Sequence, residues 1–277
     1  MTSGASDSVS SSDMEVGMTS SDPAVLEWED RDGIALIWLD NPPVNALDRR
    51  TLDAIALTVK EVEASDVRGA VITGRGNVFS AGADLYAVLE GGNEYIQSSV
   101  QALADAFSGL FRFSKPLVAA INGHAIAGGC IIAGACDYRV VGSGPALMGF
   151  AELRVGVPFP LYALEIARWV TEPRYLQEVV YFGRTYEPAE ALKRGLADEI
   201  VEPDAVLDRA FEVARRLARV PAKTFAVTKR ALRQPTVEFV ESFGPINDED
   251  AKLMWASDEM RESIRDFLVS VLGSAER

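Results

Sequence analysis

The sequence predicts an α/β fold followed by a helical region at the C-terminus. Short apolar runs with the composition of buried strands alternate with longer segments in which apolar residues recur at helical spacing. From Pro160 onward the pattern is helical to the end of the chain. A length of 277 residues allows one large domain or two small ones, with ample core. We therefore expect helices layered on a sheet.

The charge balance excludes two classes of partner. The chain carries 41 acidic and 27 basic residues, a formal net charge of −14. Nucleic acid and anionic membrane surfaces repel such a chain, so we expect neither as a partner. An anionic ligand would have to be held by local basic groups and by backbone N–H donors.

The N-terminal segment, residues 1–22, is expected to be a disordered tail. It contains eight serines and four acidic residues but no lysine or arginine, so it has little apolar surface to bury. It has neither the basic segment nor the apolar core of a secretory signal. Cys130 and Cys136 lie in one apolar run and would face different sides of a helix. We therefore expect reduced, buried thiols and a cytoplasmic protein.

The first half of the chain begins with a hairpin and a capped helix. Residues 25–28 and 34–39 have the pattern of two strands, and Asn41-Pro42-Pro43 ends the second. Asp48 is placed to cap a helix. The apolar face of that helix would be formed by Leu52, Ile55, Val59 and Val62. The next elements are expected at 70–73 (strand), 93–113 (helix), 117–121 (strand) and 137–141 (strand).

The rest of the chain is organised around the stretch 119–137. After the turn signal Asn122-Gly123, small and apolar residues run without a charge from Ala125 to Cys136. This run is too short to span a bilayer and suits a helix buried on all sides. Gly128-Gly129 stands where the helix should begin. Glycine there serves either close packing or bare backbone, whose unpaired N–H groups suit a developing anion.

A second stretch presents backbone in the same way. Phe79-Ser80-Ala81-Gly82-Ala83-Asp84-Leu85 follows the strand at 70–73 and a glycine-rich loop. It exposes N–H groups at the entry to a helical turn. Two such donors facing one point form an oxyanion hole.

In this order, the motif at 79–85 and Asn-Gly-His-Ala-Ile-Ala-Gly-Gly-Cys at 122–130 resemble the crotonase (enoyl-CoA hydratase/isomerase) superfamily. Lys115–Ala120, Asn41–Leu47 and Ala191–Asp198 extend the resemblance, which runs from about Val25 to the C-terminus.

The resemblance implies a crotonase-type ββα spiral core at residues 23–205 that carries the CoA-thioester site. It also implies a C-terminal helical trimerisation region at residues 206–277. The substrate would be an acyl-CoA thioester, with no separate cofactor. The assembly would be a homotrimer, or a hexamer built as a dimer of trimers.

The resemblance also implies roles for individual residues. The N–H groups of Ala83 and Gly128 would be the oxyanion donors. Asp84 is expected to cap a helix rather than to act as an acid, although its backbone could still line the CoA pocket. Residues expected to contact the substrate or its CoA are Ala46, Ala81, Ala83, Asp84, Leu85 and Gly128.

The acid–base residues depart from the pattern of two-carboxylate hydratases. In those enzymes one glutamate follows Gly-Gly-Cys, but here Ile131 stands at that position. Glu152 occupies the position of the second glutamate, and its apolar setting predicts a raised pKa. The alternative for Glu152 is a surface residue paired with Arg154.

One base and an oxyanion hole suffice to move a double bond. The departure at Ile131 therefore favours a Δ3,Δ2-enoyl-CoA isomerase that uses Glu152 as its proton shuttle. The alternatives are a hydratase that uses Glu152 alone, and a catalytically inert CoA-binding homologue.

Other candidates are weaker. His124 and Glu165 are expected to be structural, and Phe159 either shapes the acyl pocket or packs in the core. One histidine and two buried cysteines do not make a typical zinc site, so we expect no metal. No lysine or arginine follows Phe267 until Arg277, where relatives often carry a basic partner for CoA phosphate.

Overall fold

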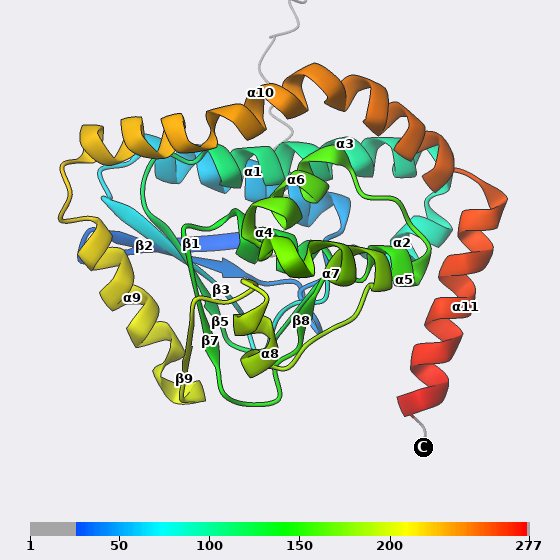
Figure 1. The fold of residues 1–277 in the computed structure, drawn as a ribbon, viewed down its shortest axis with the longest axis horizontal. Helices are drawn as coiled ribbons and strands as arrows, with labels where there is room; N and C mark the ends of the chain where they lie inside the picture. Colours follow the sequence, from blue (N-terminus) through cyan, green and yellow to red (C-terminus); the bar gives the residue numbers. More distant parts are fainter. Residues whose placement is uncertain (1–25, 276–277) are drawn as a thin grey trace, which may run out of the picture.

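The structure is a computed structural model that describes residues 26–275. Its main sheet has six strands in the order β1-β2-β3-β5-β7-β9 (Figure 1). Only the first pair is antiparallel, and the other four pairs are parallel. The strands are β1 (Leu26–Arg31), β2 (Ile34–Leu39), β3 (Gly69–Gly74), β5 (Leu117–Ile121), β7 (Tyr138–Gly142) and β9 (Glu199–Val201). Every residue of β3 and β5 is buried, as expected of parallel strands covered on both faces.

A second, parallel sheet of three short strands lies beside the first. Its members are β4 (Val78–Ser80), β6 (His124–Ile126) and β8 (Met148–Gly149). Each one directly follows a strand of the main sheet, and each is followed by a helix. The middle of the chain is therefore built from repeated strand–strand–helix turns, the arrangement that the resemblance implied.

Helices cover both faces of the main sheet because alternate residues of its strands point to opposite sides. Leu36, Val71 and Val118 pack on one side against α9 (Val206–Leu217). Their neighbours Ile37, Ile72 and Ala119 belong to the larger core on the other side. That core is closed by α1 (Arg49–Ala64), α3 (Gly92–Arg112), α4 (Gly128–Ala135) and α6 (Leu161–Val170).

The expected cap at Asp48 is confirmed, and prolines stand at the start of several later helices. The Asp48 side chain accepts a 2.7 Å hydrogen bond from Thr51 N–H at the start of α1. Pro173, Pro188 and Pro203 each open a helical segment, and Pro221 directly precedes α10. The remaining short elements are α2 (Leu85–Glu90), α5 (Glu152–Val155), η1 (Pro173–Tyr175), α7 (Leu176–Phe182), α8 (Pro188–Lys193) and η2 (Pro203–Ala205).

Two helices complete the described chain, α10 (Ala222–Trp255) and α11 (Asp258–Ala275). Figure 1 shows α10 running across α1, α3 and α6, with α11 turning down beside α2 and α5. Buried Lys229 and Arg233 of α10 hold the two carboxylate oxygens of Asp137 at 2.7 and 2.9 Å. Burial lowers the pKa of Lys229 to about 8, and the neighbouring Asp137 carboxylate opposes that change. This ion-pair cluster fastens the C-terminal region to the end of α4.

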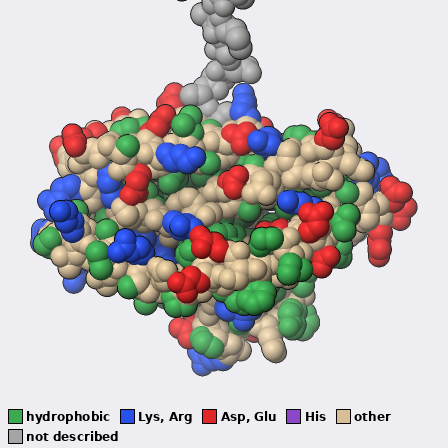
Figure 2. All heavy atoms as spheres, turned by 90° about the horizontal axis from the view of Figure 1, so that it is seen from above, with side chains coloured by type: hydrophobic (Ala, Val, Ile, Leu, Met, Phe, Trp, Pro, Cys, Tyr) green, Lys and Arg blue, Asp and Glu red, His purple; other side chains and the backbone are tan. Residues whose placement is uncertain are grey.

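On the outer face that α10 helps to form, basic and acidic side chains gather toward opposite ends. Figure 2 shows lysine and arginine side chains gathered toward the end where α9 meets α10, and acidic ones toward the end where α11 begins. Neither sign covers the whole face.

The helix in the run 125–136 begins at Gly128, as expected from the Gly128-Gly129 pair, and the first two residues of the run end β6. One expectation needs correction. The region after Pro160 is not wholly helical, because β9 joins the main sheet beside β7. Both cysteines are free and buried, as predicted. The tail at 1–22 lies outside the described residues, and the division at 205/206 stays a prediction.

Candidate active site

The loop at 79–85 is held rigidly by the segment before α1. Ser80 Oγ donates to Asn45 O at 2.7 Å and accepts from Gly82 N–H at 3.2 Å. Leu47 accepts from Asp84 N–H at 3.3 Å and donates to Gly82 O at 2.8 Å. Ala83 lies between these two bonds, in a parallel bridge with Leu47 that leaves its own N–H unused.

Glycines bring this loop against the start of α4. Gly82 has φ +88°, and a Cβ there would lie 2.8 Å from Ile126 O and 3.0 Å from Gly128 N. A Cβ on Gly129 would lie 2.3 Å from Ser80 O. Side chains at Gly82 and Gly129 would thus separate the two segments. The sequence left open whether Gly128-Gly129 serves close packing or bare backbone, and here the two occur together.

The residue directly before α4 has an unusual backbone conformation. Ala127 has φ +49° and ψ −123°, a conformation that an L residue rarely adopts. Its N–H donates to Gly149 O, and its C=O accepts from Ile131 N–H. Gly128 is the first residue of α4, so its N–H has no acceptor within the helix. Within residues 26–275, no hydrogen bond uses the N–H of Ala83 or of Gly128.

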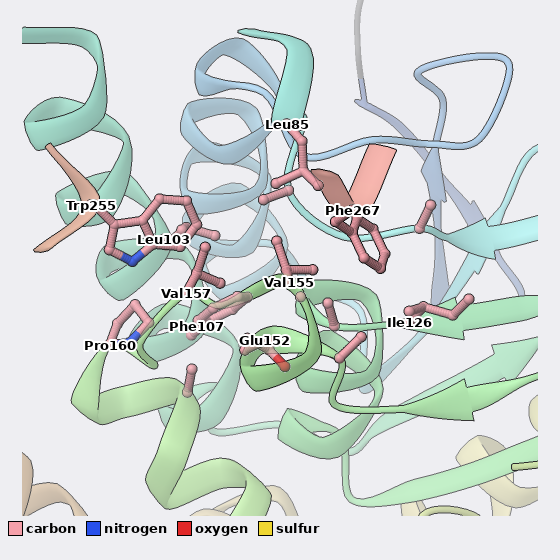
Figure 3. A pocket seen from close by; sticks show the side chains of 16 residues that line it. Leu85, Leu103, Phe107, Ile126, Glu152, Val155, Val157, Pro160, Trp255 and Phe267 are labelled. Atoms are coloured by element: carbon pink, nitrogen blue, oxygen red, sulfur yellow. The ribbon is translucent and has the colours of Figure 1, made fainter. Parts of the chain in front are cut away.

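Both segments line one apolar cavity of about 80 Å³ (Figure 3). The cavity is formed by Ala81, Ala83, Leu85, Leu103, Phe107, Ile126, Ala127, Gly128, Ala151, Glu152, Val155, Val157, Pro160, Ala163, Trp255 and Phe267. Glu152 is the one ionisable residue of this lining. The cavity is therefore lined by a single side chain that can carry a proton and by two residues, Ala83 and Gly128, whose N–H groups make no hydrogen bond among the described residues.

Glu152 is the first residue of α5, and its side chain points into the middle of the cavity (Figure 3). The residue is 8% exposed, and its Oε2 has no hydrogen-bond partner among the described residues. Burial raises the pKa of Glu152 to about 8, because a charged carboxylate is poorly solvated there. The bond from its own backbone N–H opposes this shift. The carboxyl is thus able to exchange a proton near neutral pH.

The pairing of Glu152 with Arg154 is not observed. The Arg154 side chain instead lies with its guanidinium carbon 6.0 Å from the centre of the Phe267 ring. Glu152 therefore has a raised pKa and is not paired with Arg154, which distinguishes it from a surface glutamate in a salt bridge.

The expected site residues fall into two groups. Ala81, Ala83, Leu85, Gly128 and Glu152 meet in the cavity, as described above. Ala46 lies outside it and accepts a hydrogen bond from Asn41 through its C=O. Asp84 also lies outside this cavity, and it caps α2 by accepting from Ala87 N–H at 3.0 Å, as predicted.

The weaker candidates have structural contacts. His124 Nδ1 accepts from Leu147 N–H at 3.1 Å, and Glu165 pairs with Arg168 at 3.0 Å. Phe159 packs against the main core. Ile131 is fully buried in that core and does not line the cavity.

The C-terminal region lines the cavity of its own chain. Trp255 of α10 and Phe267 of α11 reach the site together with Leu103 and Phe107 of α3. Helical spacing marked several of these residues as core, but no local signal distinguishes a core position from a cavity wall.

No group of three or more histidine, cysteine, aspartate or glutamate residues arranged to hold a metal ion occurs in the part of the chain that is described. None of the described helices is long and apolar enough to cross a membrane.

Comparison with known proteins identifies relatives over most of the chain. The family model described as enoyl-CoA hydratase/isomerase matches residues 29–269. Mitochondrial enoyl-CoA delta isomerase 1 of Mus musculus is 30% identical over 217 residues, covering 77% of this chain and 75% of the relative. A putative enoyl-CoA hydratase of Thermus thermophilus is 34% identical over 206 residues, covering 72% and 80%. The crystal structure of human mitochondrial delta3-delta2-enoyl-CoA isomerase superposes with a TM-score of 0.85 at 26% identity, covering 90% and 99%.

Proposed function

The chain is an enzyme of the enoyl-CoA hydratase/isomerase family, and from this premise we propose that it moves the double bond of a 3-enoyl-CoA ester to the 2 position. The observation that carries the proposal is the single buried carboxyl, Glu152, in a cavity lined also by Ala83 and Gly128, whose N–H groups make no hydrogen bond among the described residues. This set of groups matches a reaction that needs one proton carrier and one stabilised oxyanion.

In the proposed reaction, ionised Glu152 removes a proton from C2 of the ester. The electron pair left by that proton moves onto the thioester oxygen, forming an enolate. The N–H groups of Ala83 and Gly128 hold the enolate oxygen, and loss of one such donor typically costs about 3–4 kcal/mol. As the C2–C3 double bond forms, the C3–C4 double bond opens and C4 takes the proton back from Glu152. Glu152 ends as it began, and no proton is gained or lost.

A raised pKa suits Glu152 for both halves of this cycle. A group with a pKa near the working pH is protonated and deprotonated with little cost, and burial brings Glu152 to about 8. At lower pH the group is increasingly protonated and the reactive carboxylate becomes scarce. We therefore expect kcat/KM to rise with pH and to level off above about 8.

Hydration of a 2-enoyl-CoA is the second candidate, supported by relatives named hydratases. Water addition needs a positioned water molecule, which two carboxylates normally hold. The side chain of Ile131 cannot accept a hydrogen bond and is fully buried. The proposal therefore favours isomerisation.

We further propose a homotrimer, or a dimer of trimers, in the cytoplasm, with no cofactor beyond the CoA of the substrate. The family supports the trimer, and so do apolar side chains that α10 leaves exposed in the single chain. These are Val227, Leu232, Phe239, Phe243, Ile246, Leu253 and Met254. Sedimentation should give a trimer or hexamer, and a stable monomer at micromolar concentration would contradict this.

The test compares isomerisation and hydration in three proteins. Wild type is incubated with 3-enoyl- and 2-enoyl-CoA while double-bond position and water addition are followed. Glu152→Gln should lower isomerisation by about 10²–10⁴ while CoA-ester binding persists. Ile131→Glu should raise hydration relative to isomerisation, because it supplies a second acceptor for water.

Glu165→Gln is the matched control, since Glu165 is also buried but pairs with Arg168 outside the cavity. It should leave the rates nearly unchanged. Wild type that hydrates 2-enoyl-CoA faster than it isomerises the 3-enoyl ester would refute the isomerase proposal. Full activity in Glu152→Gln would move the chemistry to another residue.

A further inference from the structure

The cavity is open at one side and closed at the other. Ala81, Leu85, Ile126, Ala127 and Phe267 are partly exposed. The opposite side is formed by residues that are all buried, namely Leu103, Phe107, Val157, Pro160, Ala163 and Trp255. In Figure 3, Leu85, Ile126 and Phe267 lie on one side of Glu152, and Leu103, Pro160 and Trp255 on the other.

Because the cavity is open at one side only, a bound ester can lie in it in one orientation. A bulky CoA group can leave only through the open side. The thioester oxygen must reach the N–H groups of Ala83 and Gly128, and the carbons that exchange a proton must reach Glu152. The acyl chain beyond them then continues away from the opening, toward Trp255.

Trp255 forms a firm end to this path. It is 4% exposed, and its indole Nε1–H donates to Pro158 O at 3.1 Å. It belongs to a separate apolar cluster with Ala251, Met260 and Ile264, which joins the ends of α10 and α11. The indole is thus packed in this cluster and anchored at its polar atom, so it cannot swing aside without breaking both contacts.

A second, smaller cavity lies behind this wall. Trp255, Leu103 and Ala83 line both cavities, so they form the partition between them. The other walls of the second cavity are mainly apolar and include Val88, Ile96 and Val100. Its volume of about 10 Å³ is room for no more than one water molecule. In the wild-type protein it cannot take the end of an acyl chain.

We propose that Trp255 is the residue that limits acyl-chain length, and that the enzyme takes short-chain enoyl-CoA esters. This inference rests on the proposed function, because it assumes that the cavity holds the acyl group of a CoA ester. Removing the indole joins the two cavities and opens an apolar extension toward α1 and α3. Trp255 is a specificity-determining residue that acts by volume and takes no part in the proton transfer.

The first test measures binding of unreactive saturated esters, hexanoyl-CoA and dodecanoyl-CoA, by calorimetry. Wild type should prefer hexanoyl-CoA. In Trp255→Ala the ratio of dodecanoyl to hexanoyl affinity should rise at least about tenfold, since even one methylene in an apolar pocket is worth about that factor. The kcat/KM ratio for dodec-3-enoyl- and hex-3-enoyl-CoA should change in the same direction.

Two further variants keep the test decisive if Trp255→Ala does not fold. Trp255→Phe keeps an aromatic ring of smaller volume and should give a partial shift toward longer chains. Ala163→Val adds volume at the closed side and should shift the preference toward shorter chains. Trp28→Ala is the control, because Trp28 lies on β1 and bonds to Glu61 outside both cavities.

The outcomes separate this inference from the proposed function. Length-selective binding that changes in the Trp255 variants, without isomerisation by any of them, supports the inference and refutes the isomerase proposal. Wild type that binds both esters equally would overturn the inference. A chain-length profile that stays the same in folded Trp255→Ala or Trp255→Phe would also overturn it.

Discussion

Replacing Glu152 by glutamine should cost activity and yet stabilise the protein at high pH. Burial raises the pKa of Glu152 from its ordinary value of 4.5 to about 8. Between these two pH values the folded protein keeps a proton that the unfolded chain has released. The folded state then binds more protons than the unfolded state, so the free energy of unfolding falls as pH rises through this window.

The size of the effect follows from the two pKa values. One pH unit corresponds to about 1.36 kcal/mol, so the interval from 4.5 to 8 gives at most about 5 kcal/mol at pH 8 and above. Glutamine has nearly the same shape and no charge to bury. The free energy of unfolding of Glu152→Gln should therefore match that of wild type at pH 4, and exceed it by a few kcal/mol at pH 9.

Denaturant unfolding of both proteins across pH 4–9 measures this difference. Glu165→Gln is again the matched control, since Glu165 has similar burial but an ion-pair partner in Arg168. It should show no gain at high pH. A difference between Glu152→Gln and wild type that is independent of pH would refute the reasoning, because it would mean that the Glu152 carboxylate is not desolvated in the folded state.

The close backbone contact at Gly129 and the ion-pair cluster of Asp137, Lys229 and Arg233 give further predictions. Gly129→Ala should destabilise the fold by about 1–3 kcal/mol and reduce turnover, because its Cβ would lie 2.3 Å from a backbone oxygen of the neighbouring loop. Gly109 lies in α3, and a Cβ there would have its nearest neighbour, a methyl group of Val59, at 3.8 Å. Gly109→Ala should therefore stabilise the fold by about 0.5–1 kcal/mol, and thermal unfolding compares the stabilities of the two variants. Asp137→Asn should cost about 3–5 kcal/mol in denaturant unfolding, because it leaves the buried cations of Lys229 and Arg233 without their carboxylate. Unchanged stability in Asp137→Asn would mean that this cluster does not hold α10 on the core.

Local features of this chain were predictable because their signals lie within a few residues. The strands β3 and β5 follow from short apolar runs, and α1 from a cap and a helical apolar face. Short strands were harder to predict. β6 extends two residues into an apolar run that suits a helix equally well, and its partners β4 and β8 are distant in sequence.

By itself, the sequence determined which groups are available for chemistry. The glycines at 128–129, the Ala81-Gly82-Ala83 turn and Glu152 are recognisable from their order and spacing, and so is the isoleucine at 131. Only the tertiary structure decided what surrounds them. Trp255 and Phe267 lie more than 100 residues from Glu152 along the chain, and no local pattern reports that they wall its cavity. The pKa of Glu152 depends on those same walls, because desolvation is set by every atom around the carboxyl and not by its neighbours in sequence.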